Sequence, residues 1–118
     1  MSAAAMTVRG GLSPGILDKV LNYIRARLMR RIDVEELAGV ACLSAYHFAR
    51  EFARSVGISP SRYVMRCRLE RAAQLLTGSD WPLSRIALEL GFCDQSHFTR
   101  MFTQQTGETP HAYRQRRA

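Results

Sequence analysis

Apolar residues recur every three or four positions along most of the chain, which is the period of an α-helix. Nothing alternates with a period of two over a useful length, as a half-buried strand would. The pattern predicts an all-α fold of about seven helices. We expect them over residues 14–29, 33–41, 44–55, 60–77, 83–90 and 94–105, with a short last helical turn from residue 110 that leads into a basic tail at Arg114–Arg117.

Helix-start signals support several of these limits. Ser13-Pro14 and Ser59-Pro60 each place a capping side chain before a proline at the first helical position, where its missing N–H costs nothing. Asp33, followed by Glu36, matches a capping box. We therefore expect four parts: a loose tail (1–12), a first helix-turn-helix subdomain (13–58), a long linker helix (59–78) and a second helix-turn-helix subdomain (79–118).

The chain repeats itself at a distance of 50 residues. The segment 47–52 matches 97–102, and Gly57, Pro60 and Tyr63 match Gly107, Pro110 and Tyr113. Upstream the distance is 49, as Leu37-Ala38 matches Ile86-Ala87, so the second copy carries one inserted residue. A short unit of helix, tight turn and helix is therefore used twice.

A wheel at about 100° per residue separates two faces of the second helix in each copy. With Phe48 and Phe52, or Phe98 and Phe102, turned to the core, an arginine lies at the centre of the opposite face: Arg50 in the first copy and Arg100 in the second. Arginine suits guanine O6 and N7, although a solvated surface is the alternative. The outward set is Tyr46, Arg50 and Arg54 in the first copy, flanked by His47, Ala49 and Ala53. In the second copy it is Ser96, Arg100 and Gln104, flanked by His97, Thr99 and Thr103. His97 could contact a base, contact a phosphate or cover the helix edge.

The charge of the chain agrees with a nucleic-acid partner. Net charge is +7, and sixteen arginines accompany the single lysine, Lys19. The arginine fork pairs bidentately with phosphate and guanine. Charge alone would fit a solvated basic surface equally well, but together with two helix-turn-helix units it favours DNA.

Other functional classes find little support. There is no Gly-rich phosphate loop, nucleophile motif or metal-ligand spacing, so we expect neither an enzyme nor a cofactor or metal. Cys42, Cys67 and Cys93 lack paired spacing and are expected to be buried thiols. An apolar share of 47% argues against disorder. No apolar run would span a bilayer and the start is too weakly apolar for a signal peptide, so we expect a cytoplasmic protein without a membrane partner.

One stretch carries a family resemblance. Ile86-Ala87, Gly91-Phe92, Ser96, Phe98, Arg100 and Phe102, followed by Gly107, Thr109-Pro110 and Tyr113-Arg114, form a long pattern of mixed residue types. With it, the chain from about Leu17 to Arg114 resembles the DNA-binding domain of AraC/XylS-type transcription regulators. The resemblance implies two helix-turn-helix modules, joined by a rigid helix, that read adjacent major-groove segments on one face of bent DNA.

Site residues carry over by position. Tyr46, Ala49 and Arg50 match base-facing positions of the first module, and Gln95, Ser96, His97 and Arg100 match those of the second. Two residues depart from the pattern. Ala49 stands where a longer polar side chain is frequent, which predicts fewer bases read by the first module. Pro82 replaces the capping residue expected before the fifth helix.

We therefore expect a sequence-specific regulator of transcription that binds double-stranded DNA as a monomer. By the resemblance it is an activator, with RNA polymerase as a candidate second partner. Most such regulators carry a further effector-binding or dimerising domain, so the chain is either a stand-alone member or the C-terminal part of a longer protein. The rival is a helical module whose arginines bind an acidic protein. Steep salt dependence together with preference among DNA sequences separates the two.

Overall fold

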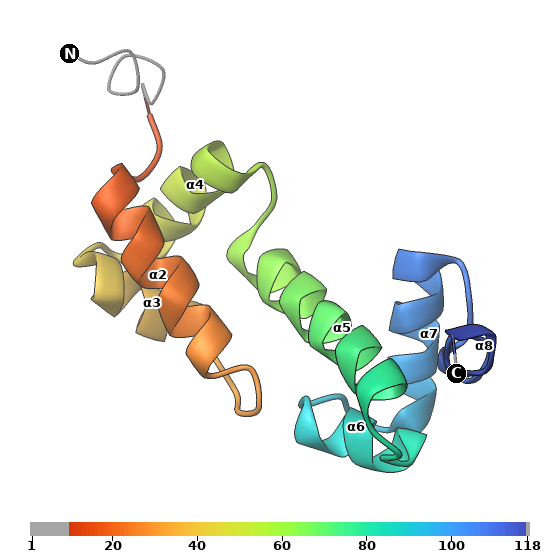
Figure 1. Ribbon diagram of the computed structural model, residues 1–118. Helices are drawn as coiled ribbons and strands as arrows, with labels where there is room; N and C mark the ends of the chain where they lie inside the picture. The colour runs from red at the N-terminus through yellow and green to blue at the C-terminus, as the bar shows by residue number, and fades with distance from the viewer. Residues whose placement is uncertain (1–9, 118) are drawn as a thin grey trace. The chain divides into compact units, whose positions relative to one another are not determined.

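The computed structural model describes residues 10–117, and within that range all regular secondary structure is α-helical (Figure 1). Seven helices are present in this described part, as the periodicity predicted. In chain order they are α2 (Pro14–Ala26), α3 (Val34–Ala41), α4 (Ala45–Val56), α5 (Pro60–Gly78), α6 (Leu83–Glu89), α7 (Gln95–Thr106) and α8 (Pro110–Arg117).

Side-chain caps start most of these helices. Ser13, Asp33, Ser44 and Asp94 each accept a hydrogen bond from the backbone N–H three residues later, which satisfies one of the free donors of a helix start. Ser59 does the same for α5, at 3.3 Å from the N–H of Arg62. Pro82 precedes α6 without any side-chain cap, in agreement with its departure from the family pattern.

α2 ends three residues earlier than predicted. At Arg27 the backbone leaves helical geometry (φ −129°, ψ 25°), and the carbonyls that follow have partners outside the helix. Arg68 donates from Nε to the Leu28 carbonyl at 3.2 Å and from Nη2 to the Arg30 carbonyl at 2.7 Å. The helical pattern of apolar residues continues to Leu28 in the sequence, but the hydrogen bonds from Arg68 hold residues 28–30 in a non-helical conformation.

Two expectations about the chain ends need correction. Residues 10–12 are not part of a loose tail, because Gly11 and Leu12 donate hydrogen bonds to α4 and Leu12 is buried; residues 1–9 of the expected tail lie outside the described residues. The C-terminal basic residues are also not a tail. They form α8, a full helix that reaches Arg117.

The chain divides into two compact units. The first comprises the residues up to Arg27 and Ile32–Val64, and the second comprises Leu28–Arg31 and the residues from Met65 onward. This division differs from the expected one, because most of α5 belongs to the second unit rather than to a separate linker. The fully buried large side chains of the first unit come from α2, α3 and α4: Val20, Ile24, Leu37, Phe48 and Phe52.

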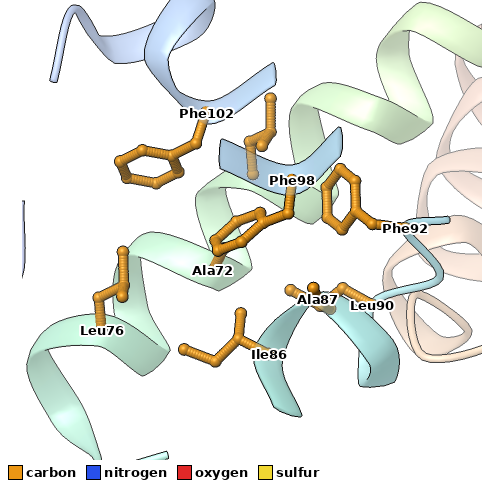
Figure 2. Close-up of a cluster of buried hydrophobic side chains, with 9 residues drawn as sticks. Ala72, Leu76, Ile86, Ala87, Leu90, Phe92, Phe98 and Phe102 are labelled. Carbon is orange, nitrogen blue, oxygen red and sulfur yellow. The ribbon is translucent and has the colours of Figure 1, made fainter. Parts of the chain in front are cut away.

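The core of the second unit is built on α5. Figure 2 shows Ala72 and Leu76 of α5 facing Ile86, Ala87 and Leu90 of the α6 region and Phe98 and Phe102 of α7. The Phe98 and Phe102 rings lie 5.7 Å apart, edge to face, and Tyr113 of α8 packs at 5.2 Å on Phe102. Full burial of such aromatic side chains is worth about 2–3 kcal/mol each, so this cluster holds α7 against α5 and α6.

Candidate nucleic-acid interface

The outward face of α4 is the one that the helical wheel predicted. Phe48 and Phe52 have no exposed surface, and their rings lie 5.5 Å apart in the core of the first unit. On the opposite side Tyr46 is 77% exposed, and Arg50 is exposed as well. Ala49 is half-buried beside them.

α7 repeats this arrangement in the second unit. Phe98 and Phe102 are fully buried, and the side chains that the wheel placed outward, Ser96, Arg100 and Gln104, are exposed. Gln95, which the family resemblance made base-facing, is exposed as well. On the flank, the Thr103 hydroxyl donates to the Thr99 carbonyl at 2.7 Å, so this hydroxyl is occupied within the helix. The exposure of the candidate residues follows from burial of the phenylalanines; their contact with DNA stays a prediction.

Both helix-turn-helix units make the same turn. In the first, the N–H of Leu43 donates to the Ala38 carbonyl at 3.0 Å; in the second, the N–H of Phe92 donates to the Ala87 carbonyl, also at 3.0 Å. A backbone hydrogen bond that spans six residues is typical of a helix C-terminus that ends with a residue in the left-handed conformation. The cap of the next helix follows Leu43 directly in the first unit, whereas one more residue, Cys93, intervenes in the second. Cys93 is therefore the insertion that changes the repeat distance from 49 to 50.

His97 is hydrogen-bonded to this inserted residue. Its Nδ1 accepts from the backbone N–H of Cys93 at 3.3 Å, and its ring packs edge-on against Phe92 at 5.5 Å. The backbone N–H of His97 in turn donates to the Asp94 carboxylate at 2.7 Å. With Nδ1 as acceptor, the neutral imidazole carries its proton on Nε2. These contacts agree with one of the three roles predicted for His97, that of covering the edge of the helix. Donation from Nε2 to a DNA base or phosphate stays a prediction.

Arg54 differs from the other predicted arginines, because it is paired within the protein. Its Nη1 lies 3.3 Å from the Glu51 carboxylate, and a side chain on Gly10 would approach that same nitrogen to 2.9 Å. Glu51 also accepts from the N–H of Gly11. The Arg54–Glu51 pair joins neighbours three residues apart and was predictable from the sequence, whereas the contact of Gly11 with Glu51 spans 40 residues and was not.

A family model described as a helix-turn-helix domain matches residues 37–116, which include both turns and both arginine-bearing helices. The chain belongs to the AraC/XylS family. It is 35% identical over 100 residues to the MmsAB operon regulatory protein of Pseudomonas aeruginosa, a match that covers 85% of this chain and 33% of that protein. The chain thus spans about a third of the length of this curated relative.

Solved structures of AraC-type domains share the fold. A transcriptional regulator from Chromobacterium violaceum, described as an AraC-type DNA-binding domain-containing protein, has a TM-score of 0.83 at 27% identity and covers 88% of this chain and 93% of that one. The DNA-binding domain of AdpA, a global transcriptional factor solved in complex with a target DNA, has a TM-score of 0.79 at 31% identity, with 85% and 90% covered.

Two arginines outside the AraC-type recognition helices have structural partners. Arg68, about half-buried, bonds the carbonyls of the 28–31 segment and lies against Gly91, and burial lowers the pKa of its guanidinium. Arg114 donates from Nε to the Leu76 carbonyl at 2.9 Å and from Nη2 to the Ser79 carbonyl at 3.3 Å. Leu76 lies in the last turn of α5, whose carbonyls have no partner within the helix, whereas Leu28 and Arg30 lie beyond the end of α2. Sequence reasoning assigned Arg114 to a basic tail, and this was wrong.

The terminal arginines are also less free than a tail would make them. Arg116 and Arg117 lie 3.2 and 3.1 Å from the Glu108 carboxylate, and the Arg117 guanidinium stacks on the Tyr113 ring at 3.9 Å. Such surface pairs are weak.

The cysteines of this AraC-type chain depart from expectation. All three were expected to be buried, but only Cys67 is; Cys42 and Cys93 are exposed. Their positions explain this, because each lies in the turn of a helix-turn-helix unit, where the backbone runs along the surface. Among residues 10–117 no three His, Cys, Asp or Glu side chains gather as a metal site would need. No helix in the described range has the length and apolar character needed to cross a membrane.

Proposed function

We propose that the chain binds double-stranded DNA sequence-specifically and regulates transcription, with α4 and α7 each entering the major groove at one of two adjacent segments. The observation that carries this proposal is the duplicated helix in which an exposed arginine, Arg50 or Arg100, lies opposite a buried pair of phenylalanines. Helices of this kind in helix-turn-helix proteins place their outward face on base edges.

The exposed side chains suit the chemistry of the groove. Arg50 and Arg100 each present a planar fork that pairs with O6 and N7 of guanine. Ser96 and Gln95 supply a hydroxyl and an amide for bases or phosphates, and the Tyr46 ring suits the methyl group of thymine. Because the two sets differ, the preferred site is asymmetric and a monomer of the chain is sufficient to read it.

The biological setting follows from the family. The AdpA domain, 31% identical, was solved with a target DNA, which supports DNA as the partner here. Activation, with RNA polymerase as a second partner, is the role that the family resemblance favours, and the cytoplasm is where a bacterial regulator meets its DNA. The rival function, capture of an acidic protein, is supported only by the net charge of +7.

Selection of bound duplexes from a random pool tests the proposal. The selected duplex and a scrambled one are then titrated at several salt concentrations. We expect a clear preference for the selected duplex, and a log affinity that falls with log salt by about 0.9 per phosphate contact. A flat salt response, or equal binding of both duplexes, contradicts sequence-specific DNA binding and leaves the protein-interaction module as the better reading.

A further inference from the structure

The segment before α2 is attached to the recognition helix of the first unit. The N–H of Gly11 donates to the Glu51 carboxylate at 2.5 Å, and the N–H of Leu12 donates to the Ser55 hydroxyl at 2.7 Å. The Leu12 side chain is only 4% exposed. Two successive backbone donors and a buried apolar anchor thus hold the segment along α4.

The two glycines of this segment suit the place that they occupy. Gly10 and Gly11 have φ values of 72° and 106°, a conformation that other residues rarely adopt. A Cβ on Gly11 would lie 2.7 Å from the Ser55 hydroxyl, and one on Gly10 would lie 2.9 Å from the Arg54 guanidinium. Any larger residue would therefore push the segment away from α4.

Glu51 is the acidic group at the centre of this contact. Its carboxylate has Arg54 at 3.3 Å and His47 at 4.0 Å, and its side chain is 13% exposed. The N–H of Gly11 lowers the pKa of this carboxyl, against an opposing effect of burial, and Arg54, His47 and Arg50 lower it further. The carboxylate is therefore charged at neutral pH and compensated from two sides, by the segment and by Arg54.

We propose that the Gly10–Leu12 segment contributes to DNA binding through Arg54. Because the segment donates a hydrogen bond to the Glu51 carboxylate, it weakens the ion pair between that carboxylate and Arg54. The Arg54 guanidinium can then pair with a DNA phosphate. This inference rests on the proposed function of α4. Without the segment, Glu51 has only its neighbours on α4 to satisfy its charge, and an acidic group competes with phosphate for the guanidinium.

Replacement of Gly11 by alanine tests the inference without altering α4. The new Cβ and the unfavourable φ should release the segment. We expect Gly11→Ala to weaken binding to the selected duplex about two- to fivefold, the size of one surface ion pair. Gly15→Ala is the matched control, since Gly15 is exposed in α2 with nothing within 4 Å of its added Cβ, and it should bind as the unaltered chain does.

Glu51→Gln separates this role from a merely structural one. The amide oxygen can still accept from Gly11, but it carries no charge to hold Arg54. In the Gly11→Ala background we expect Glu51→Gln to restore the lost affinity. Ser55→Ala, which removes the acceptor of Leu12, is a second way to loosen the segment and should act in the same direction. Hydrogen exchange at the amides of residues 11 and 12 reports release of the segment without DNA.

The outcomes separate the inference from the function beneath it. If the unaltered chain shows no preference for any duplex, the proposed function fails and the inference fails with it. If the unaltered chain binds specifically, but Gly11→Ala binds equally well with its segment released, the inference alone is wrong. Loss of affinity that Glu51→Gln does not restore also overturns it, since the segment would then act only by supporting the fold.

Discussion

Cys42 and Gly91 occupy equivalent positions 49 residues apart, and both have a left-handed backbone, with φ of 58° and 81°. Each is the residue at which the first helix of its unit turns toward the recognition helix. In the described part of the chain Cys42 is the only non-glycine residue with positive φ. The same left-handed turn is thus made by a cysteine in the first unit and by a glycine in the second.

Cys42→Gly should stabilise the protein. A left-handed conformation costs a residue with a Cβ about 1–2 kcal/mol, whereas the extra freedom of glycine in the unfolded chain costs about 0.5–1 kcal/mol. Because Cys42 is exposed, little packing is lost. We expect a net gain of about 0.5–1 kcal/mol in the free energy of unfolding, measured in urea against Cys42→Ala, which removes the thiol but retains the strain. The reciprocal change, Gly91→Ala, should destabilise by about 1 kcal/mol, since the nearest atom to its added Cβ is 3.7 Å away and only the backbone resists it. A glycine variant no more stable than the alanine variant would show that the turn at Cys42 is unstrained.

His97→Ala should loosen the turn of the second unit. It removes the acceptor of the Cys93 N–H and the ring that packs on Phe92, which we expect to cost about 0.5–1.5 kcal/mol and to speed hydrogen exchange at Cys93. His47 occupies the equivalent position of the first unit and is 56% exposed there, so His47→Ala should change stability by less than about 0.5 kcal/mol. Equal effects of the two changes would mean that His97 does not support the inserted residue.

Arg114→Ala should destabilise far more than Arg116→Ala. Arg114 is half-buried and satisfies two carbonyls at the end of α5, so its loss should cost about 1–3 kcal/mol. Arg116, two residues later on the same helix, is 69% exposed and pairs with Glu108 at the surface, so its loss should cost less than about 1 kcal/mol. Urea unfolding of the two variants provides the comparison. Similar losses would indicate that Arg114 is a surface charge rather than a cap.

Attachment of the N-terminal segment should depend on pH. The pKa of Glu51 in the folded chain lies below its ordinary value of 4.5, chiefly because the Gly11 N–H bonds the carboxylate. Stability from this contact is therefore fully present above that ordinary value and is lost as the pH falls through the lower, folded value. We expect protection of the Gly11 amide to be constant near neutral pH and to decline only in this acidic range. Glu51→Gln should remove the decline, and a decline that persists in that variant would assign it to another group.

Arg50→Ala and Arg100→Ala should each weaken binding to the selected duplex by about 1–3 kcal/mol. Each change should relax base choice at one or two positions, and in different halves of the site, since the two arginines lie on different recognition helices. Repeated site selection with each variant measures this. Arg116→Ala should instead weaken all sequences alike, because Arg116 lies in α8, outside the recognition helices, and a phosphate contact carries no base preference. Equal losses on selected and random DNA for Arg100→Ala would make it a phosphate contact.

The sequence by itself determined the features that depend on near neighbours. Helix starts at Ser13, Asp33 and Ser44 were predictable because a cap bonds an N–H three residues away. The outward faces of α4 and α7 were predictable too, because a period of 3.6 residues places Phe48 and Arg50 on opposite sides of one helix. The repeat itself predicted that both units would be built alike.

The tertiary structure alone decided which distant groups would meet. Arg68 and Leu28 are 40 residues apart, Arg114 and Leu76 are 38, and Leu12 and Ser55 are 43, and no local pattern links the members of these pairs. Each bond pairs a charged or polar side chain with a single backbone group, and every residue offers such a group. Which of them is chosen depends on how the helices pack, so the early end of α2, the bonds of Arg114 to the end of α5 and the docking of Gly10–Leu12 on α4 appear only in the folded chain.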